Sequence, residues 1–405
     1  MLELPLPWPA RVVNAAGRAL RRHGQELVEF DVPLLLEEAR QQARADDFGE
    51  PDFMPALRVL VESAERDANL SLLGRSGLRD AIVTSLAQRL LRVHRRLTHP
   101  NGSATTLVPP LIVIGLPRSG TTLLHRLLAL APEARALRYW ELRRPLPPPG
   151  HDDRRAWAGS QQRAFKWLAR GLDAKHFSGP EAPEECLFLF DSTLVSVTFW
   201  IAAPVFGYLD WYLAQDQRAP YRTYRELLEL FQAETPERRL TLKAPVHTAH
   251  VPALRAAVPE AHLLQLHRDP RPALASMNSL FATLHRVVTE RVDLGRMGHA
   301  NLNFAATGME RLLDTRAGLP DGTIFDVYYA ELVADPVGTV RAVRRHFDLS
   351  FDAEYEARLV AFMRENPQHR HGAHRYDARD FGLDDEQILG RFERYLERFP
   401  RARAR

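Results

Sequence analysis

Apolar residues recur with two different spacings along the 405-residue chain, and the change of spacing divides it. In the first hundred or so residues they recur every three or four positions, which predicts helices over 10–23, 31–43 and 78–97 and gives no strand signal. Asp31 and Ser76 are the expected N-caps of the last two helices. We therefore expect a helical N-terminal region, residues 1–105, that packs on the rest of the chain or shapes the entrance to a site.

Short apolar runs rich in branched residues follow, each succeeded by helical spacing. They predict strands over 111–115, 239–243, 261–267 and 323–328. Strands that alternate with helices imply right-handed crossovers and a parallel sheet. The expected fold class is therefore α/β with a central parallel sheet, over residues 106–390, and the residues after each strand should meet at one edge of that sheet.

Residues 151–238 interrupt this alternation with mostly helical spacing, directly after a proline-rich stretch that breaks regular structure. The most apolar window, 187–209, contains aspartate, proline and several hydroxyl residues, which speak against a membrane span and favour buried core or an apolar pocket. Residues 391–405 are expected to form a basic tail, an amphipathic helix with a frayed end.

Composition adds few constraints. The net charge of +3 is too small to indicate a nucleic-acid partner. A single cysteine, Cys186, excludes an intramolecular disulfide and a cysteine zinc cluster and suits a reducing compartment. The N-terminus has no basic, apolar leader, so the expected location is the cytoplasm.

The first predicted strand ends in a loop suited to binding an anion, Gly115-Leu116-Pro117-Arg118-Ser119-Gly120-Thr121-Thr122, and helical spacing follows. Gly115 and Gly120 allow backbone conformations that a Cβ would hinder, and the loop's N–H groups can converge at the helix N-terminus. The Gly-x4-Gly spacing matches a P-loop, but Thr121 stands where nucleotide triphosphatases have lysine. The anion's charge would instead be met by the helix end and by Arg118, Ser119, Thr121 and Thr122.

Residues 117–122 resemble the 5'-phosphosulfate loop of sulfotransferases that use 3'-phosphoadenosine 5'-phosphosulfate (PAPS). Residues 268–276 look like the 3'-phosphate motif of the same family, an arginine followed eight positions later by a serine. The resemblance implies a P-loop-like, three-layer fold in which 151–238 is an acceptor-binding insertion, and it implies no obligatory metal. It places the donor on Arg118, Ser119, Gly120, Thr121, Thr122, Arg268, Ser276 and Tyr329. Two other readings stay open: Arg268 could pair with Asp269 or cap a helix, and Tyr329 could be a core residue.

Lys243, at the end of a predicted strand, resembles the lysine of the family's Lys-x-Pro motif, which neutralises charge on the leaving oxygen. The general base stays open between three residues. Several similar sulfotransferases have a catalytic glutamate at the position of Glu141, His247 offers an imidazole of suitable pKa, and His125 lies on the helix after the loop. Pro183-Glu184-Glu185 is expected to be a capping or surface feature.

A run near the C-terminus, residues 366–376, contains three histidines but no fixed ligand geometry, so no zinc site is expected there. It looks more like the family's basic loop that closes over the nucleotide. Which of Arg370, His371 or Arg375 would contact the nucleotide is left open.

The function that the resemblance implies is transfer of the sulfuryl group from PAPS to a hydroxyl or amine of a small-molecule acceptor, with release of adenosine 3',5'-bisphosphate. Aromatic residues in the insertion hint at a lipid-like, aromatic or polyketide-type acceptor, although such clusters are more often core. They are Phe188, Phe190, Phe199, Trp200, Phe206, Tyr208, Trp211 and Tyr212. The alternatives are a P-loop kinase or nucleotide triphosphatase, which the missing lysine disfavours, and a nucleotide-binding protein without catalysis. Oligomeric state is left open.

Overall fold

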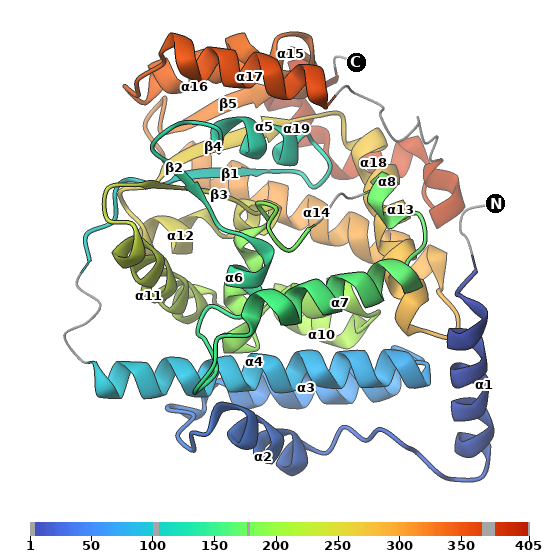
Figure 1. Cartoon of the computed structure of the whole chain (residues 1–405). Coiled ribbons are helices and arrows are strands. Elements are labelled where there is room, and N and C mark those ends of the chain that lie inside the picture. The colour runs from blue at the N-terminus through green and yellow to red at the C-terminus, as the bar shows by residue number, and fades with distance from the viewer. Residues whose placement is uncertain (1–4, 100–104, 176–178, 367–376, 404–405) are drawn as a thin grey trace.

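A computed structural model describes residues 5–99, 105–175, 179–366 and 377–403, and Figure 1 shows its arrangement. At its centre lies a parallel sheet in the order β2-β3-β1-β4-β5. The strands are β1 (Leu111–Gly115), β2 (Ala134–Ala136), β3 (Arg239–Lys243), β4 (His262–His267) and β5 (Ile324–Tyr328). The expected α/β fold class with a central parallel sheet is therefore confirmed.

Four of the five strands lie where the apolar runs predicted them. The strand that sequence reasoning missed, β2, has only three residues, none of them branched at Cβ, so neither alternation nor propensity could reveal it. The central strand β1 pairs with β3 through Val113 and Lys243 and with β4 through Gly115 and Leu266. This register brings the residues that follow β1, β3 and β4 to one edge of the sheet.

Helices cover both faces of the sheet, and the side-chain alternation of β1 divides the core between them. Leu111 and Val113 face a smaller core formed with α5 (Thr121–Leu128), α16 (Pro336–His346) and α17 (Ala353–Glu365). Ile112 and Ile114 face the larger core on the other side. In Figure 1 α16 and α17 lie above the sheet, and most helices of the larger core lie below it.

Helices from three parts of the chain surround the sheet, as Figure 1 shows, and most of them contribute to the larger core. From the N-terminal region come α1 (Trp8–Arg22), α2 (Val32–Ala43), a 3-10 turn (Pro51–Phe53), α3 (Met54–Arg66) and α4 (Leu72–Thr98). From the insertion come α6 (Tyr139–Arg143), α7 (Arg154–Leu168), α8 (Leu172–Lys175), a 3-10 helix (Cys186–Thr193), α9 (Thr198–Ala202), α10 (Phe206–Leu213) and α11 (Arg218–Glu234). From the second half come a 3-10 helix (Pro245–His250), α12 (Val251–Ala257), α13 (Pro270–Val288), α14 (Leu294–Ala317) and α15 (Tyr329–Ala334).

The helix caps of the N-terminal region agree with one prediction and correct another. The Asp31 side chain accepts from the Leu34 N–H at 2.9 Å, as expected for the N-cap of α2. The expected cap at Ser76 is wrong: the N-cap of α4 is Ser71, five residues earlier, whose hydroxyl accepts from the Gly74 N–H at 3.1 Å. The insertion is mostly helical, as its spacing predicted.

The stretch 391–405, expected to be an amphipathic helix with a frayed end, contains a short helix with one buried face, α19 (Glu393–Arg398), and then a 3-10 turn (Pro400–Arg403). A 3-10 turn (Ala378–Phe381) and α18 (Asp385–Arg391) precede it. Tyr395, Leu396 and Phe399 are buried, and the ring of Phe399 packs 4.2 Å from that of His267 at the end of β4. This segment is therefore part of the core. In the part of the chain that the structure describes, no helix is both long and apolar enough to span a membrane.

Candidate active site

The loop between β1 and α5 closes tightly over the end of the sheet. Gly115 has φ +131°, and a Cβ there would lie 2.5 Å from the Leu266 carbonyl oxygen of β4. Gly120 has φ +94°, and a Cβ there would lie 2.9 Å from the ring of Tyr329. Arg118 adopts φ +66°, which is uncommon for a residue with a side chain and costs backbone strain. The two glycines are thus required by the fold of the loop.

The hydroxyl residues of this loop have different roles. The Ser119 hydroxyl donates to the Leu116 carbonyl oxygen at 2.6 Å, and the residue is fully buried. Ser119 therefore closes the loop and does not face the cavity that Thr121 and Thr122 line at the start of α5. These two threonines stand where the N–H groups and dipole of a helix N-terminus favour an anion.

The two anion-binding motifs predicted from the sequence meet in space. The Arg118 Nε donates to the Ser276 hydroxyl at 3.0 Å. The Arg268 Nη1 donates to the Arg118 carbonyl oxygen at 2.5 Å, and its guanidinium lies 4.0 Å from the centre of the Tyr329 ring. We call Arg118, Arg268, Ser276 and Tyr329 the anion cluster.

Arg268 does not pair with the neighbouring aspartate. Asp269 caps α13 through the Arg271 N–H at 2.9 Å and forms an ion pair with the Arg271 guanidinium at 2.6 Å. The Arg268 backbone is instead held by the C-terminal segment, because its N–H donates to the Tyr395 hydroxyl at 3.2 Å. Sequence reasoning missed Tyr395, which no local motif marks.

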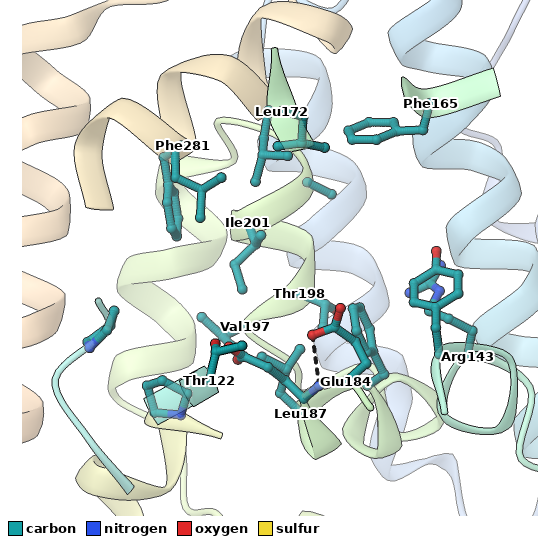
Figure 2. Close-up of a pocket in the computed structure, with 18 of the residues that line it drawn as sticks. Thr122, Arg143, Phe165, Leu172, Glu184, Leu187, Val197, Thr198, Ile201 and Phe281 are labelled. Atoms are coloured by element: carbon teal, nitrogen blue, oxygen red, sulfur yellow. Dashed lines mark hydrogen bonds between the residues drawn. The ribbon is translucent and has the colours of Figure 1, made fainter. Parts of the chain in front are cut away.

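A cavity of about 730 Å³ extends from the loop into the helical part of the molecule. Arg118, Thr121, Arg268 and Tyr329 line it on the sheet side, and residues of α4, α7 and α13 line it further away. Figure 2 shows its two kinds of wall. Thr122, Glu184, Thr198 and Arg143 lie in one part of the view, and Phe165, Leu172, Ile201 and Phe281 lie in the other.

Most of the aromatic residues between 187 and 212 belong to the core, but two of them line this cavity, as Trp157 and Phe165 of α7 also do. Phe188 and Phe199 are lining residues, whereas Phe190, Trp200, Phe206, Tyr208 and Tyr212 are buried in the larger core and Trp211 packs against it. The apolar window therefore supplies both core and pocket.

Glu184 and Glu185 line the cavity, so the expectation of a capping or surface feature was wrong. A short antiparallel bridge holds their segment against the start of α6, since Arg138 lies opposite Pro183 and the Glu184 N–H donates to the Leu137 carbonyl at 3.1 Å. Glu184 is only 7% exposed, and one of its carboxylate oxygens accepts from the Glu185 N–H at 2.9 Å.

Lys243, the last residue of β3, is buried and is not itself among the cavity-lining residues, but it pairs with Glu185, which is. Its Nζ lies 2.6 Å from the Glu185 Oε1, and the lysine side chain is 1% exposed. A buried ammonium needs such a partner, because an unpaired charge is costly to desolvate. The pair adjoins the cavity on its carboxylate side.

Glu141, the first of the three predicted general bases, caps the N-terminus of the short helix α6. Its Oε1 accepts from the Arg135 guanidinium at 2.9 Å and its Oε2 from the Arg138 N–H at 2.8 Å, forming a capping box. Both oxygens are therefore engaged, and Glu141 is not among the cavity-lining residues.

The two predicted histidine bases also lie away from the cavity. His247 is fully buried, with its Nδ1 2.6 Å from the Tyr221 hydroxyl and its Nε2 3.3 Å from the Cys186 Sγ, and burial lowers its pKa to about 3. His125 Nε2 donates to the Thr241 carbonyl at 2.9 Å, and burial lowers its pKa to about 4. Neither ring lines the cavity in this conformation.

A second polar group lines the cavity on the insertion side. The Asp191 carboxylate accepts from the Arg143 guanidinium at 2.8 Å and from the Thr198 hydroxyl at 2.5 Å, and burial raises its pKa. Gln162, only 7% exposed, also lines the cavity, and its amide atoms have no hydrogen-bond partner among the described residues. An unsatisfied buried amide is suited to a polar group of a ligand.

The basic-loop residues Arg370, His371 and Arg375 lie outside the described residues, while Met363 and Asn366 just before them line the cavity. Within the described ranges, no group of three or more histidine, cysteine, aspartate or glutamate side chains could hold a metal ion.

Comparison with known proteins gives consistent matches. The model of the sulfotransferase family matches residues 109–353. Omega-hydroxy-beta-dihydromenaquinone-9 sulfotransferase Stf3 of Mycobacterium tuberculosis is 23% identical over 323 residues, which cover 77% of this chain and 81% of that protein. The crystal structure of sulfotransferase STF1 of M. tuberculosis has a TM-score of 0.77 and 30% identity, covering 89% of this chain and 98% of that one. Sulfotransferase STF9 of Mycobacterium avium has a TM-score of 0.81 and 25% identity, covering 91% and 96%.

Proposed function

The chain belongs to the sulfotransferase family, whose members use PAPS, and from this premise we propose that it transfers the sulfuryl group of PAPS to the hydroxyl of an apolar, lipid-like small molecule. The observation that carries the donor assignment is the 3.0 Å bond between Arg118 and Ser276, because it brings both predicted anion sites within reach of one nucleotide. The apolar cavity carries the acceptor assignment.

The donor would lie along the edge of the sheet. Its sulfated end binds Gly120, Thr121 and Thr122 at the start of α5, and its 3'-phosphate binds Arg268 and Ser276. Guanidinium and hydroxyl groups are suited to this because a phosphate accepts several charge-assisted hydrogen bonds. Tyr329, which stacks on Arg268, adds a contact to the nucleotide.

The acceptor oxygen would attack the sulfur while the bond between sulfur and the bridging phosphate oxygen breaks, and adenosine 3',5'-bisphosphate would leave. Lys243 stabilises the charge that develops on the leaving oxygen, an effect that acts mainly in the transition state. Glu184 takes the proton of the acceptor hydroxyl. Its position in the cavity wall, 7% exposed, supports this role, since a general base must lie within reach of the proton that it takes.

The walls of the cavity support the proposed acceptor class. Leu172, Ile201 and Phe281 offer an aliphatic and aromatic surface in one part of the cavity, whereas Thr122, Thr198 and Glu184 lie in the other part (Figure 2). Such a site suits a hydroxyl at one end of an apolar skeleton, with a further polar group for Gln162. The relative Stf3 is named for a menaquinone bearing an omega-hydroxyl, which agrees with this class. We propose that the insertion, residues 151–238, is the acceptor-binding part.

The test is transfer of labelled sulfate from PAPS to a panel of long-chain and prenyl alcohols, with matched amines and short alcohols. We expect sulfated long-chain alcohol and an equal amount of bisphosphate product. Nucleotide binding without transfer to any acceptor would favour a non-catalytic binder. Magnesium-dependent hydrolysis of ATP would favour the kinase or nucleotide triphosphatase alternative.

A further inference from the structure

Helix α1 carries an apolar face that no described part of the chain covers. Trp8 is 68% exposed and Val12 is 55% exposed. At about 100° per residue, Trp8 and Val12 share one face with three exposed alanines, Ala15, Ala16 and Ala19. The opposite face, Ala10, Asn14 and Gly17, is buried.

A row of arginines borders this apolar face. Arg11, Arg18 and Arg22 follow one another at spacings that place them along one side of the helix, and all three are exposed. Arg18 pairs with Glu290 at 2.5 Å. The helix itself contains no acidic residue. An apolar face with tryptophan beside a row of cations is the pattern of a helix that lies in the interface of an anionic membrane.

Helix α1 packs, through its buried face, against residues that line the cavity. The Asn14 side chain accepts from the Leu73 N–H at 3.2 Å, and Leu73 lines the cavity at the start of α4. Val288, which also lines it, accepts from the Ser71 N–H at 2.9 Å. In Figure 1, α1 stands beside the N-terminal end of α4, close to α13. The apolar end of the cavity therefore lies next to the inner face of α1.

We propose that α1 is a membrane-interface helix that docks the protein on a bilayer containing anionic lipids. Trp8 and Val12 insert among the lipids, and Arg11 and Arg22 contact their headgroups. In this orientation the apolar end of the cavity lies near the bilayer, from which a lipid-like acceptor enters. This last step rests on the proposed function, whereas docking itself does not.

Co-sedimentation of the full chain with vesicles tests docking. We expect binding to vesicles of phosphatidylcholine with phosphatidylglycerol and little binding to phosphatidylcholine alone. The double variant Arg11→Gln/Arg22→Gln should bind about tenfold more weakly, since each arginine near an anionic surface contributes, and Trp8→Ser/Val12→Ser should lose a comparable amount. The matched control is Leu27→Ser/Leu34→Ser, which removes two exposed leucines (58% and 53%) outside this face and should bind as wild type.

Three results would overturn docking: no vesicle binding, equal loss in the control variant, or a wild-type dimer that Trp8→Ser/Val12→Ser converts to monomer. The last would mean that a second copy covers the face. Transfer to a short, water-soluble alcohol separates this inference from the proposed function, since both variants should retain it. If no alcohol is sulfated but vesicles still bind, the proposed function fails and docking stands. If alcohols are sulfated and vesicles do not bind, docking fails alone.

Discussion

The Nε of Arg118 lies 3.0 Å from the Oγ of Ser276, although 158 positions separate the two residues in the chain. Arg118 follows β1 and Ser276 lies on the helix after β4, and these two strands are neighbours in the sheet. Parallel neighbours place the residues after their carboxyl ends together. In the proposed complex, one nucleotide bridges both residues.

Replacing either member of this pair should weaken donor binding. For Arg118→Ala we expect the Kd of adenosine 3',5'-bisphosphate to rise about tenfold to a hundredfold, because a hydrogen bond to a charged group contributes about 1.5–3 kcal/mol. Ser276→Ala should have a smaller effect of the same sign. Calorimetric titration measures both. Arg379→Ala serves as control, since its side chain is 80% exposed; unchanged affinity in Arg118→Ala would contradict the donor site.

Lys243 should matter for turnover more than for nucleotide affinity. We expect Lys243→Met to lower kcat about a hundredfold or more, the scale for removing a group that stabilises transition-state charge. Breaking a buried ion pair also costs about 3–5 kcal/mol of stability, so thermal unfolding must be followed in parallel.

The double variant Lys243→Met/Glu185→Gln separates the two effects of this change. Removing both charges of the 2.6 Å pair should recover stability without recovering kcat. Normal turnover in either variant would remove Lys243 from the mechanism.

The base assignment is tested by a pair of matched substitutions. Glu184→Gln should lower kcat about a hundredfold to ten-thousandfold with little change in PAPS affinity, as for loss of a general base. Glu141→Gln should leave kcat nearly unchanged and lower stability by about 1 kcal/mol, since its carboxylate caps α6. The reverse pattern, with activity lost in Glu141→Gln, would restore Glu141, one of the three candidate bases of the sequence analysis.

The residues of the candidate site differ in whether they could be predicted from the sequence. The loop from Gly115 to Thr122 could be predicted because strand, turn and helix signals are local, and Arg268 because residues 268–276, which follow a recognisable strand, resemble a motif of the family. Glu184 could not be found this way. It reaches the cavity through a bridge between Arg138 and Pro183, a pairing that depends on how the insertion folds back.

The burial of individual side chains could not be predicted from the sequence either. His247 follows Lys243 by four residues and has a suitable intrinsic pKa, yet the 3-10 helix that carries it turns the ring into the core against Tyr221 and Cys186. Ser119 belongs to the predicted motif, but its side chain closes the loop.

The buried histidines should make the fold sensitive to acid. Burial lowers the pKa of His247 to about 3 and that of His125 to about 4, below the value of about 6.5 expected in the unfolded chain. The unfolded state therefore takes up these protons first as the pH falls. Stability should be full above about pH 6.5 and should fall progressively toward pH 4.

The loss of stability with falling pH can be measured by thermal unfolding of wild type and His247→Gln. The measurements run between pH 7.5 and 4, values chosen to bracket about pH 6.5. The variant should lose less stability across the range, and its kcat should keep the wild-type pH dependence because the ring does not face the cavity. His299→Gln, at an exposed position, is the control. A kcat whose pH dependence changes only in His247→Gln would return this residue to the reaction.

The apolar end of the cavity should set the length of acceptor that is accepted. Ile201 lines this end near Leu172 and Phe281 (Figure 2), and Ile201→Trp would fill space that the acceptor chain occupies. Because each buried methylene contributes about 0.8 kcal/mol, excluding two or more should lower kcat/KM for a long-chain alcohol about tenfold or more. For a short alcohol, kcat/KM should change little, since the loop and Glu184 lie in the other part of the cavity. Val360→Trp, at a position 55% exposed, controls for the added ring. Steady-state rates with alcohols of increasing length test this prediction. An equal loss of kcat/KM for short and long alcohols would mean that the acceptor's apolar chain does not lie along this wall.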